Sequence, residues 1–414
     1  MTIRANRARA GRAGQVGVGD DGSAGGGAGL YADDEARARA LRYSRTRQWL
    51  VLVGMAWSGA TSVLALTTGL SARLRDWADR VAPRRIGPVM PYTAVAALAS
   101  FVAGLPLSYY QGYHVERRYE LTDRSRRSWF GEQLKGIGLG VALGAPLVQG
   151  IYWIIRRYPR RWWAVLAGLT VPFTVVLANL APVLLLPLFN KFKPLEDRAL
   201  AARIETLAGS QGVAVSEILQ MDMSRQTKKP NAFFMGLGAT KRIVLGDTLL
   251  EEFTADEIEV VLAHELGHQV HRDVWKLIGF GALTTAATAY AVNRLAPSLI
   301  ARVGPRYGLD PERGLEDVAA LPLLGLLAGA VTLTLAPIQN AVSRDLVEHP
   351  ADVYALDLTG KRDAFIGAME KLGRLSLADP KPPALVKHLL YTHPPLQERI
   401  DFGRAYEATG RGDA

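Results

Sequence analysis

Two histidines and a glutamate within the stretch 261–269 have the spacing of a metal site. His264 and His268 are four residues apart, so on an α-helix their imidazoles lie on one face, one turn apart. Glu265 follows His264 directly, about 100° further round the helix. This His-Glu-x-x-His pattern is typical of sites in which two histidines bind Zn²⁺ and the glutamate takes a proton from the attacking water.

The surrounding sequence predicts the helix that this pattern needs. Thr254 and Glu257 have the spacing of a capping box, which marks a helix N-terminus. A chance pair of surface histidines is the alternative, and the rarity of histidine (7 in 414 residues) argues against it. The residues expected on the buried face follow the helical period: Ile258, Val261, Leu262 and Leu266.

A third ligand must be a carboxylate or another histidine, because the chain has no cysteine. Glu348 and Asp352 are four residues apart, so both face the same way on a helix. We expect Glu348 to bind the metal and Asp352 to hold a ligand histidine from behind. An ordinary acidic helix face is the alternative, and Pro350 between the two residues would kink or break the helix.

The stretch 392–399 adds a histidine before two prolines, His393, and an arginine, Arg399. Near a metal, both could stabilise the oxyanion of a tetrahedral intermediate. An exposed histidine before a turn is the plainer interpretation when the stretch is taken alone. His271 falls on the same helical face as His264 and His268, and we expect it to be a solvated histidine at the helix end.

Apolar residues make up 49% of the chain and charged residues 21%, and the apolar residues are concentrated in blocks. Six blocks are long enough to cross a bilayer. The fourth carries several prolines, so we expect it to be kinked. The net charge of +10 comes largely from arginines beside these blocks, which favours membrane orientation over nucleic-acid binding. The blocks are Gln48–Leu70, Pro91–Tyr110, Leu134–Ile155, Trp162–Phe189, Val274–Val292 and Val318–Pro337.

These blocks divide the chain into five parts. Residues 1–47 are predicted to be a disordered basic tail, and 48–189 to be about four membrane crossings. Residues 190–273 form a catalytic segment, 274–339 about two further crossings, and 340–414 a second catalytic segment. Six crossings place both catalytic segments on one side, and the arginine-dense tail favours the cytoplasm. Arginines between 156 and 161 fall on the predicted outer side and oppose that orientation.

The catalytic segment 190–273 is predicted to mix helices and strands. Residues 195–209 form an amphipathic helix pattern, and 217–223 a strand pattern. Residues 231–238 and 242–246 read as a β-hairpin around a glycine-containing turn. The helix that carries His264 follows and is expected to run on into the fifth crossing.

Four motifs in this order resemble the type I CAAX prenyl proteases, which are integral-membrane zinc metallopeptidases of the gluzincin group. They are HELGH (264–268), NAFFMGLGATKRIVLGDTLL (231–250), the stretch from Ser343 through Glu348 to Asp352, and THPPLQER (392–399). The resemblance extends from about residue 90 onward. It implies a mainly α fold: a multi-pass helical barrel that encloses a chamber in the membrane, with a small α+β metallopeptidase domain carrying a β-hairpin.

The resemblance also implies roles for single residues. One Zn²⁺ would be bound by His264, His268 and Glu348, with Glu265 as general base. Asp352 would support the ligands, and His393 and Arg399 would steady the substrate carbonyl or its oxyanion. The substrate backbone would pair by strand addition with Asn231, Ala232, Phe233 and Phe234.

Three features depart from the family. Six crossings are counted where the family has seven, so the number is six or seven. The spacing from the Ser-Arg pair to Glu348 is one residue longer than usual, and Pro350 is unexpected. The last two departures leave Asp345 and His349 as alternative ligands.

The sequence thus predicts a membrane-embedded zinc endopeptidase that cuts peptide or protein substrates, prenylated or not. We expect no nucleic-acid partner, and a multi-pass protein of the plasma membrane with its site facing the cytoplasm. A quality-control metalloprotease of unmodified proteins is one alternative. A catalytically silent zinc-binding membrane protein is another, although a structural zinc site has no use for Glu265. A transporter is disfavoured because no internal repeat or mid-membrane charge is seen.

Overall fold

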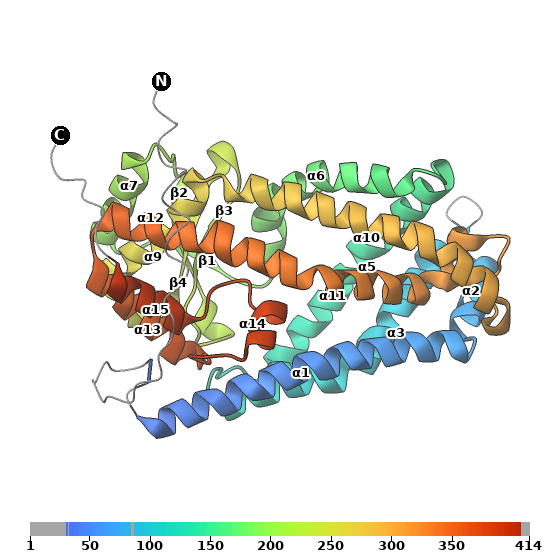
Figure 1. Ribbon diagram of the computed structural model, residues 1–414, viewed down its shortest axis with the longest axis horizontal. Coiled ribbons are helices and arrows are strands. Elements are labelled where there is room, and N and C mark those ends of the chain that lie inside the picture. Colours follow the sequence, from blue (N-terminus) through green and yellow to red (C-terminus); the bar gives the residue numbers. More distant parts are fainter. Residues whose placement is uncertain (1–29, 32, 84–86, 407–414) are drawn as a thin grey trace, which may run out of the picture.

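The computed structural model describes residues 30–31, 33–83 and 87–406. Long helices run side by side along the longest axis, while the sheet and most of the shorter helices gather at one end (Figure 1). The molecule therefore has two halves, as the apolar blocks and the two catalytic segments predicted. The long helices form the membrane half, and the sheet and the shorter helices form the mixed half.

Five helical stretches of the described chain are long and apolar enough to cross a membrane. They coincide with the first four predicted blocks and the sixth. Many of their apolar side chains face outward; Val102 and Leu134 are 66% and 64% exposed. Such a surface is suited to lipid rather than water. The helices are α1 (Asp34–Thr67), α3 (Val89–Tyr109), α5 (Arg126–Arg157), α6 (Trp162–Leu180) and α11 (Leu321–Ser343).

The predicted fifth crossing, Val274–Val292, lies within helix α10 (Asp273–Val303). This helix is 31 residues long and packs against α6 and α11. It is not among the five stretches, because its apolar run is bounded by the strongly polar Lys276 on one side and by Asn293 and Arg294 on the other, which lower its mean hydropathy. It still exposes large apolar side chains, including Leu283 at 64%.

The predicted N-terminal tail is shorter than expected within the described part of the chain. Helix α1 begins at Asp34, not near residue 48, because Asp33 accepts a hydrogen bond from the Ala36 amide and caps it. The alternating Ala and Arg residues that follow are good helix formers. Leu30 and Tyr31 pack against the mixed half. Residues 1–29 lie outside the described residues.

The fourth block is broken, as its prolines predicted. Helix α6 gives way to a π-helical turn, η2 (Ala181–Leu185), and then to a 3₁₀ turn, η3 (Leu186–Leu188). Pro182 and Pro187 lie in the first residues of these two turns. Neither proline can donate a backbone hydrogen bond, so the α-helical ladder ends here.

The described chain forms a sheet with strand order β1-β2-β4-β3. The predicted hairpin is present as the antiparallel pair β3–β4. Strand β2 pairs in parallel with β4 and antiparallel with β1, a strand that we did not predict. Strand β3 lies at the edge of the sheet. The strands are β1 (Phe192–Pro194), β2 (Glu217–Met221), β3 (Ala232–Met235) and β4 (Arg242–Gly246).

Helices from both catalytic segments share one hydrophobic core with this sheet. Leu245 of the sheet, Leu262 of the histidine-bearing helix and Phe365 from the second segment all belong to it. The two segments therefore fold as one unit although the membrane helices separate them in sequence. The helices of this half are α7 (Arg198–Ser210), α8 (Asp247–Glu252), α9 (Ala255–Val270), α12 (His349–Thr359), α13 (Arg362–Ser376), α14 (Ala384–Leu390) and α15 (Leu396–Ala405).

Short elements join these parts. In the membrane half they are α2 (Leu70–Val81), η1 (Tyr110–His114), α4 (Val115–Arg118), η6 (Pro305–Tyr307), η7 (Gly314–Glu316) and η8 (Val318–Ala320). In the mixed half they are η4 (Met223–Arg225), η5 (Gly238–Thr240) and η9 (Arg344–Glu348).

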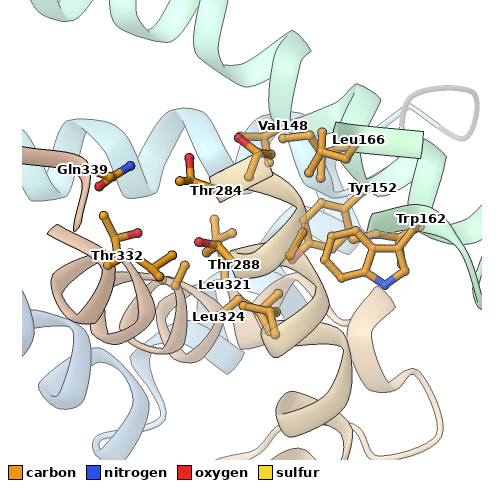
Figure 2. A pocket seen from close by; sticks show the side chains of 18 residues that line it. Val148, Tyr152, Trp162, Leu166, Thr284, Thr288, Leu321, Leu324, Thr332 and Gln339 are labelled. Carbon is orange, nitrogen blue, oxygen red and sulfur yellow. The ribbon is translucent and has the colours of Figure 1, made fainter. Parts of the chain in front are cut away.

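A cavity of about 450 Å³ lies between α5, α6, α10 and α11 in the membrane half. Figure 2 shows Tyr152 and Trp162 toward one side of it and Gln339 toward the other. Most of its lining is apolar, and Thr288 and Thr332 add hydroxyl groups. The side chains of these four helices therefore leave an open space inside the membrane half.

Candidate metal centre

Helix α9 presents the two histidines as the sequence predicted. Its capping box is formed: the Glu257 amide donates to the Thr254 hydroxyl at 3.3 Å, and the Thr254 amide donates to the Glu257 carboxylate at 2.7 Å. The helix does not run on into α10 as expected. It ends at Val270, and Arg272 takes a left-handed backbone conformation (φ 55°) before α10 begins. The break turns the chain toward the membrane half directly after the histidine pair.

The two imidazoles meet at the distance that one metal ion requires. Nε2 of His264 and Nε2 of His268 are 3.2 Å apart. Two nitrogens at about 2.05 Å from a tetrahedral zinc are roughly 3.3 Å apart. The pair therefore fits a shared metal ion.

Glu348 completes a three-residue cluster with the histidines. Its Oε2 lies 3.4 Å from Nε2 of His264, and its Oε1 lies 3.9 Å from Nε2 of His268. Oε2 is buried and has no hydrogen-bond partner in the described chain. A buried carboxylate oxygen without a partner is costly. A metal ion between Glu348 and the histidines would satisfy it.

A π-helical turn aims Glu348 at the histidines. Helix α11 continues through η9 into α12, and the His349 amide donates to the Arg344 carbonyl, five residues back. The wider turn takes up one extra residue, which accounts for the longer spacing noted in the sequence. Pro350 lies in the first turn of α12, where its missing N–H costs little. Neither departure moves Glu348 away from the histidines.

The two alternative ligands point elsewhere. Asp345 is exposed. The His349 ring packs against Phe402, with ring centroids 4.7 Å apart. The geometry therefore favours Glu348 over both as the third ligand.

His264 is supported from behind by a buried ion pair. Its Nδ1 lies 2.8 Å from the Asp352 carboxylate, which in turn accepts a 2.8 Å hydrogen bond from Nε of Arg399. Burial opposes the charged form of His264, but the neighbouring carboxylates of Asp352 and Glu348 raise its pKa to about 9. A carboxylate behind a ligand histidine fixes its tautomer and orientation. Asp352 thus occupies the position that the sequence suggested.

Comparison with known proteins shows which family the chain belongs to. Residues 30–191 match the N-terminal model of CAAX prenyl proteases, which is described as five membrane helices. Residues 194–406 match peptidase family M48. A metalloprotease of Bacillus subtilis is 31% identical over 370 residues, which are 89% of this chain and 86% of that protein. The chain belongs to peptidase family M48.

Two further proteins are similar to this M48 peptidase over most of their length. CAAX prenyl protease 1 of Saccharomyces cerevisiae is 27% identical over 89% of this chain and 85% of its own length. The crystal structure of S. mikatae Ste24p superimposes with a TM-score of 0.79 over 90% of both chains, at 24% identity. The predicted fold, a helical chamber in the membrane with a small mixed domain, is therefore confirmed. The protein is a multi-pass membrane metalloprotease, and its family implies a metal cofactor.

His268 of the M48 peptidase has a support of its own, which the sequence analysis missed. Its Nδ1 lies 3.0 Å from Oδ2 of Asp273, and the other carboxylate oxygen of Asp273 accepts a 2.7 Å hydrogen bond from Lys276. The missed signal was chemical: a second ligand histidine also needs an acceptor, and Asp273 is the first acidic residue after His268.

Glu265 lies beside the cluster. One of its carboxylate oxygens is within 4.8 Å of the ligand atoms of both histidines. Burial raises its pKa, and the neighbouring histidines lower it in part. A carboxylate with a raised pKa is suited to accept and release a proton. The position of Glu265 beside both imidazoles and its raised pKa fit the general base that the sequence predicted.

Three residues singled out in the sequence remain: His393, Arg399 and His271. His393 is near the cluster, with Nε2 3.3 Å from Oε1 of Glu348, and its side chain is 59% exposed. Arg399 is buried against Asp352, so the oxyanion role expected for it is not the one that its contacts support. His271 packs against the Tyr354 ring and is half-buried, with its Nδ1 buried, so it is only partly solvated.

Strand β3 carries most of the predicted substrate-binding stretch at the sheet edge. Ala232 is buried, Phe233 and Phe234 are half-buried, and Asn231 is exposed just before the strand. The strand packs against α9. Its outer edge has no strand partner within the described ranges, so it is open to pairing with a peptide.

Proposed function

We propose that this M48 peptidase binds one Zn²⁺ through His264, His268 and Glu348 and hydrolyses peptide bonds there. The observation that carries the proposal is the buried, unpartnered Oε2 of Glu348 beside two converging imidazole nitrogens. Two histidines and one carboxylate are a common ligand set of catalytic zinc, which keeps a further position open. The catalytic segments 190–273 and 340–414 would act as one domain.

The residues around the cluster would divide the chemistry among them. A bound Zn²⁺ would supply Lewis acidity to the scissile carbonyl and lower the pKa of the attacking water. Glu265 would take the proton from that water and pass it to the leaving amine. His393 would donate a hydrogen bond to the substrate oxygen as negative charge develops. Arg399 would position Asp352, and through it His264.

The substrate would lie along the edge of the sheet. Residues 231–234 offer backbone groups for strand addition, with Asn231 at one end. A peptide paired with β3 would run beside α9, which carries His264 and Glu265. This arrangement requires an extended segment, so folded domains would have to present a flexible stretch to be cut.

The name of the yeast relative, CAAX prenyl protease 1, supports prenylated peptides as substrates. The cavity in the membrane half would offer an apolar chain room between helices. Arginines concentrated in 37–47 and 117–127, at the catalytic end of the helices, support a site on the cytoplasmic side of the membrane, which we propose is the plasma membrane. Cleavage of two peptides that differ only in the prenyl group tests whether prenylated peptides are the preferred substrates.

The direct test of the proposal is the Glu265→Gln variant of the full chain in detergent. Cleavage of a quenched peptide should fall by about 10²-fold or more, because the base is lost. Zinc content by mass spectrometry should stay equal to that of the parent, because Glu265 is not a ligand. A variant that cleaves like the parent would refute the role of Glu265.

A further inference from the structure

A hollow of about 480 Å³ lies beside His268, between the β3–β4 turn and the break that joins α9 to α10. Lys241 lines it from the turn, and Arg272 and Trp275 line it from the break. His268 forms part of the same wall, while its Nε2 faces His264. The hollow therefore adjoins the place where a bound peptide would be cut.

Lys241 and Arg272 give this hollow an uncompensated positive charge. Neither side chain has an acidic partner among the described residues, and none of the residues that line the hollow is acidic. Neighbouring cations differ: Arg242 pairs with Glu217 at 2.9 Å, and Lys276 pairs with Asp273 at 2.7 Å. Two unpaired cations in a recess attract an anion and can bind it through charge-assisted hydrogen bonds.

Asp273, the nearest acidic residue in sequence, is not free to neutralise them. It is buried, and its two carboxylate oxygens are held by His268 and Lys276. The positive charge of the hollow is thus left for a group that comes from outside the chain.

The backbone at Arg272 adds an independent observation. Its φ of 55° is left-handed, a conformation that glycine or asparagine adopts with less strain at the end of a helix. The chain places an arginine at this position, and that arginine lines the hollow. Leu377 ends α13 in the same conformation, so the backbone at Arg272 supports a site only together with the unpaired charge of its side chain.

We propose that Lys241 and Arg272 bind a carboxylate of the peptide substrate, close to the scissile bond. The inference rests on the proposed function, because it takes His268 as a zinc ligand. The carboxylate can be the α-carboxylate of the peptide or the side chain of Asp or Glu. A peptide is favoured over a lipid phosphate, because the wall contains His268 and the turn continues directly from the edge strand β3.

The test compares matched quenched peptides on the full-length, zinc-loaded protein. The scissile bond is first mapped on an amidated, uncharged peptide by mass spectrometry. One pair then differs only in a free acid or an amide at a C-terminus within a few residues of that bond. The other pair is amidated and differs only in Glu or Gln at a nearby position. The ratio of kcat/KM within each pair does not depend on the fraction of active protein.

We expect the parent to prefer the charged member of at least one pair by about tenfold, as one charge-assisted contact predicts. A preference within the first pair identifies the α-carboxylate, and a preference within the second identifies a side chain. Lys241→Gln and Arg272→Asn should each lower the ratio, and the double variant should bring it close to one. Asparagine is chosen because it tolerates the left-handed backbone. Arg242→Gln, which removes an adjacent cation outside the hollow, should keep the ratio of the parent.

Three results would overturn the inference. One is equal cleavage of both members of both pairs by the parent, and another is a preference that survives in the double variant. The third is a role in lipid binding: cleavage in nanodiscs depends on anionic lipid through Lys241 and Arg272, without any preference among peptides. Failure of the zinc-loaded parent to cut any peptide would instead reject the proposed function and this inference with it.

Discussion

The two proposed ligand histidines are held in similar ways in two different surroundings. Behind His264 stand Asp352 and Arg399, whose side chains are 1% and 8% exposed. Behind His268 stand Asp273, which is also buried, and Lys276, which is 55% exposed. Each imidazole thus has a carboxylate behind it and a cation behind the carboxylate, but only one of the two cations is closed off from water.

This difference in exposure indicates that the two carboxylate–cation pairs have different roles. The Asp352–Arg399 pair joins α12 to α15 inside the mixed half, so it serves both the fold and the metal site. The Asp273–Lys276 pair lies within the first turn of α10, so it serves mainly the orientation of His268. Removal of a charge is costly where the partner stays buried and cheap where the partner reaches water. The next three variants test this contrast.

The largest effect is expected from Asp352→Ala. It leaves the buried Arg399 without a partner, which should cost about 3–5 kcal/mol of folding stability, and it should weaken metal binding by about 10–100-fold. Thermal unfolding in detergent and a chelator competition measure the two effects. The double variant Asp352→Ala/Arg399→Met should regain part of the stability, since both charges are gone. If Asp352→Ala were as stable as the parent, the proposed contrast between the buried pair and the exposed pair would be wrong.

A smaller effect is expected from Asp273→Ala. His268 loses its acceptor, so metal affinity should fall by about tenfold. Folding stability should change much less than in Asp352→Ala, because Lys276 can turn toward water. The same chelator competition and unfolding curve give both values. Equal destabilisation by the two alanine variants would show that exposure of the cation does not matter.

The smallest effect is expected from Lys276→Ala. An exposed ion pair contributes up to about 1 kcal/mol, so stability and metal affinity should both stay near those of the parent. Titration of zinc into the metal-free variant checks the affinity. If Lys276→Ala weakened zinc as much as Asp273→Ala does, the lysine would be as important as the carboxylate.

Sequence patterns predicted most of the helical architecture, because each pattern has a direct physical cause. The apolar blocks predicted all five described stretches that are able to span a membrane, and the prolines predicted the break after α6. The part of the tail from Asp34 to Arg47 was misjudged because its arginines suggested disorder, while Asp33 and the alanines form a helix start. Strand β1 was missed because it is three residues long and has no pattern of its own.

The candidate site was predictable where spacing alone decides and not where tertiary contacts decide. His264, His268 and Glu265 follow from one helical turn. The orientation of Glu348 depends on the π-helical turn at Arg344–Glu348, which sequence period cannot reveal. The partner of Arg399 and the support of His268 by Asp273 depend on which helices meet, so residue types suggested Arg399 for a different role and left Asp273 unnoticed.

The most direct test of the account is the zinc content of Glu348→Ala compared with Asp345→Ala, both purified as full chains. Asp345 is a matched control, an exposed acidic residue three positions earlier in the same π-helical turn. We predict that Glu348→Ala loses its zinc, while Asp345→Ala keeps about one zinc per chain, like the parent. Zinc retained in Glu348→Ala and lost in Asp345→Ala would contradict the ligand assignment.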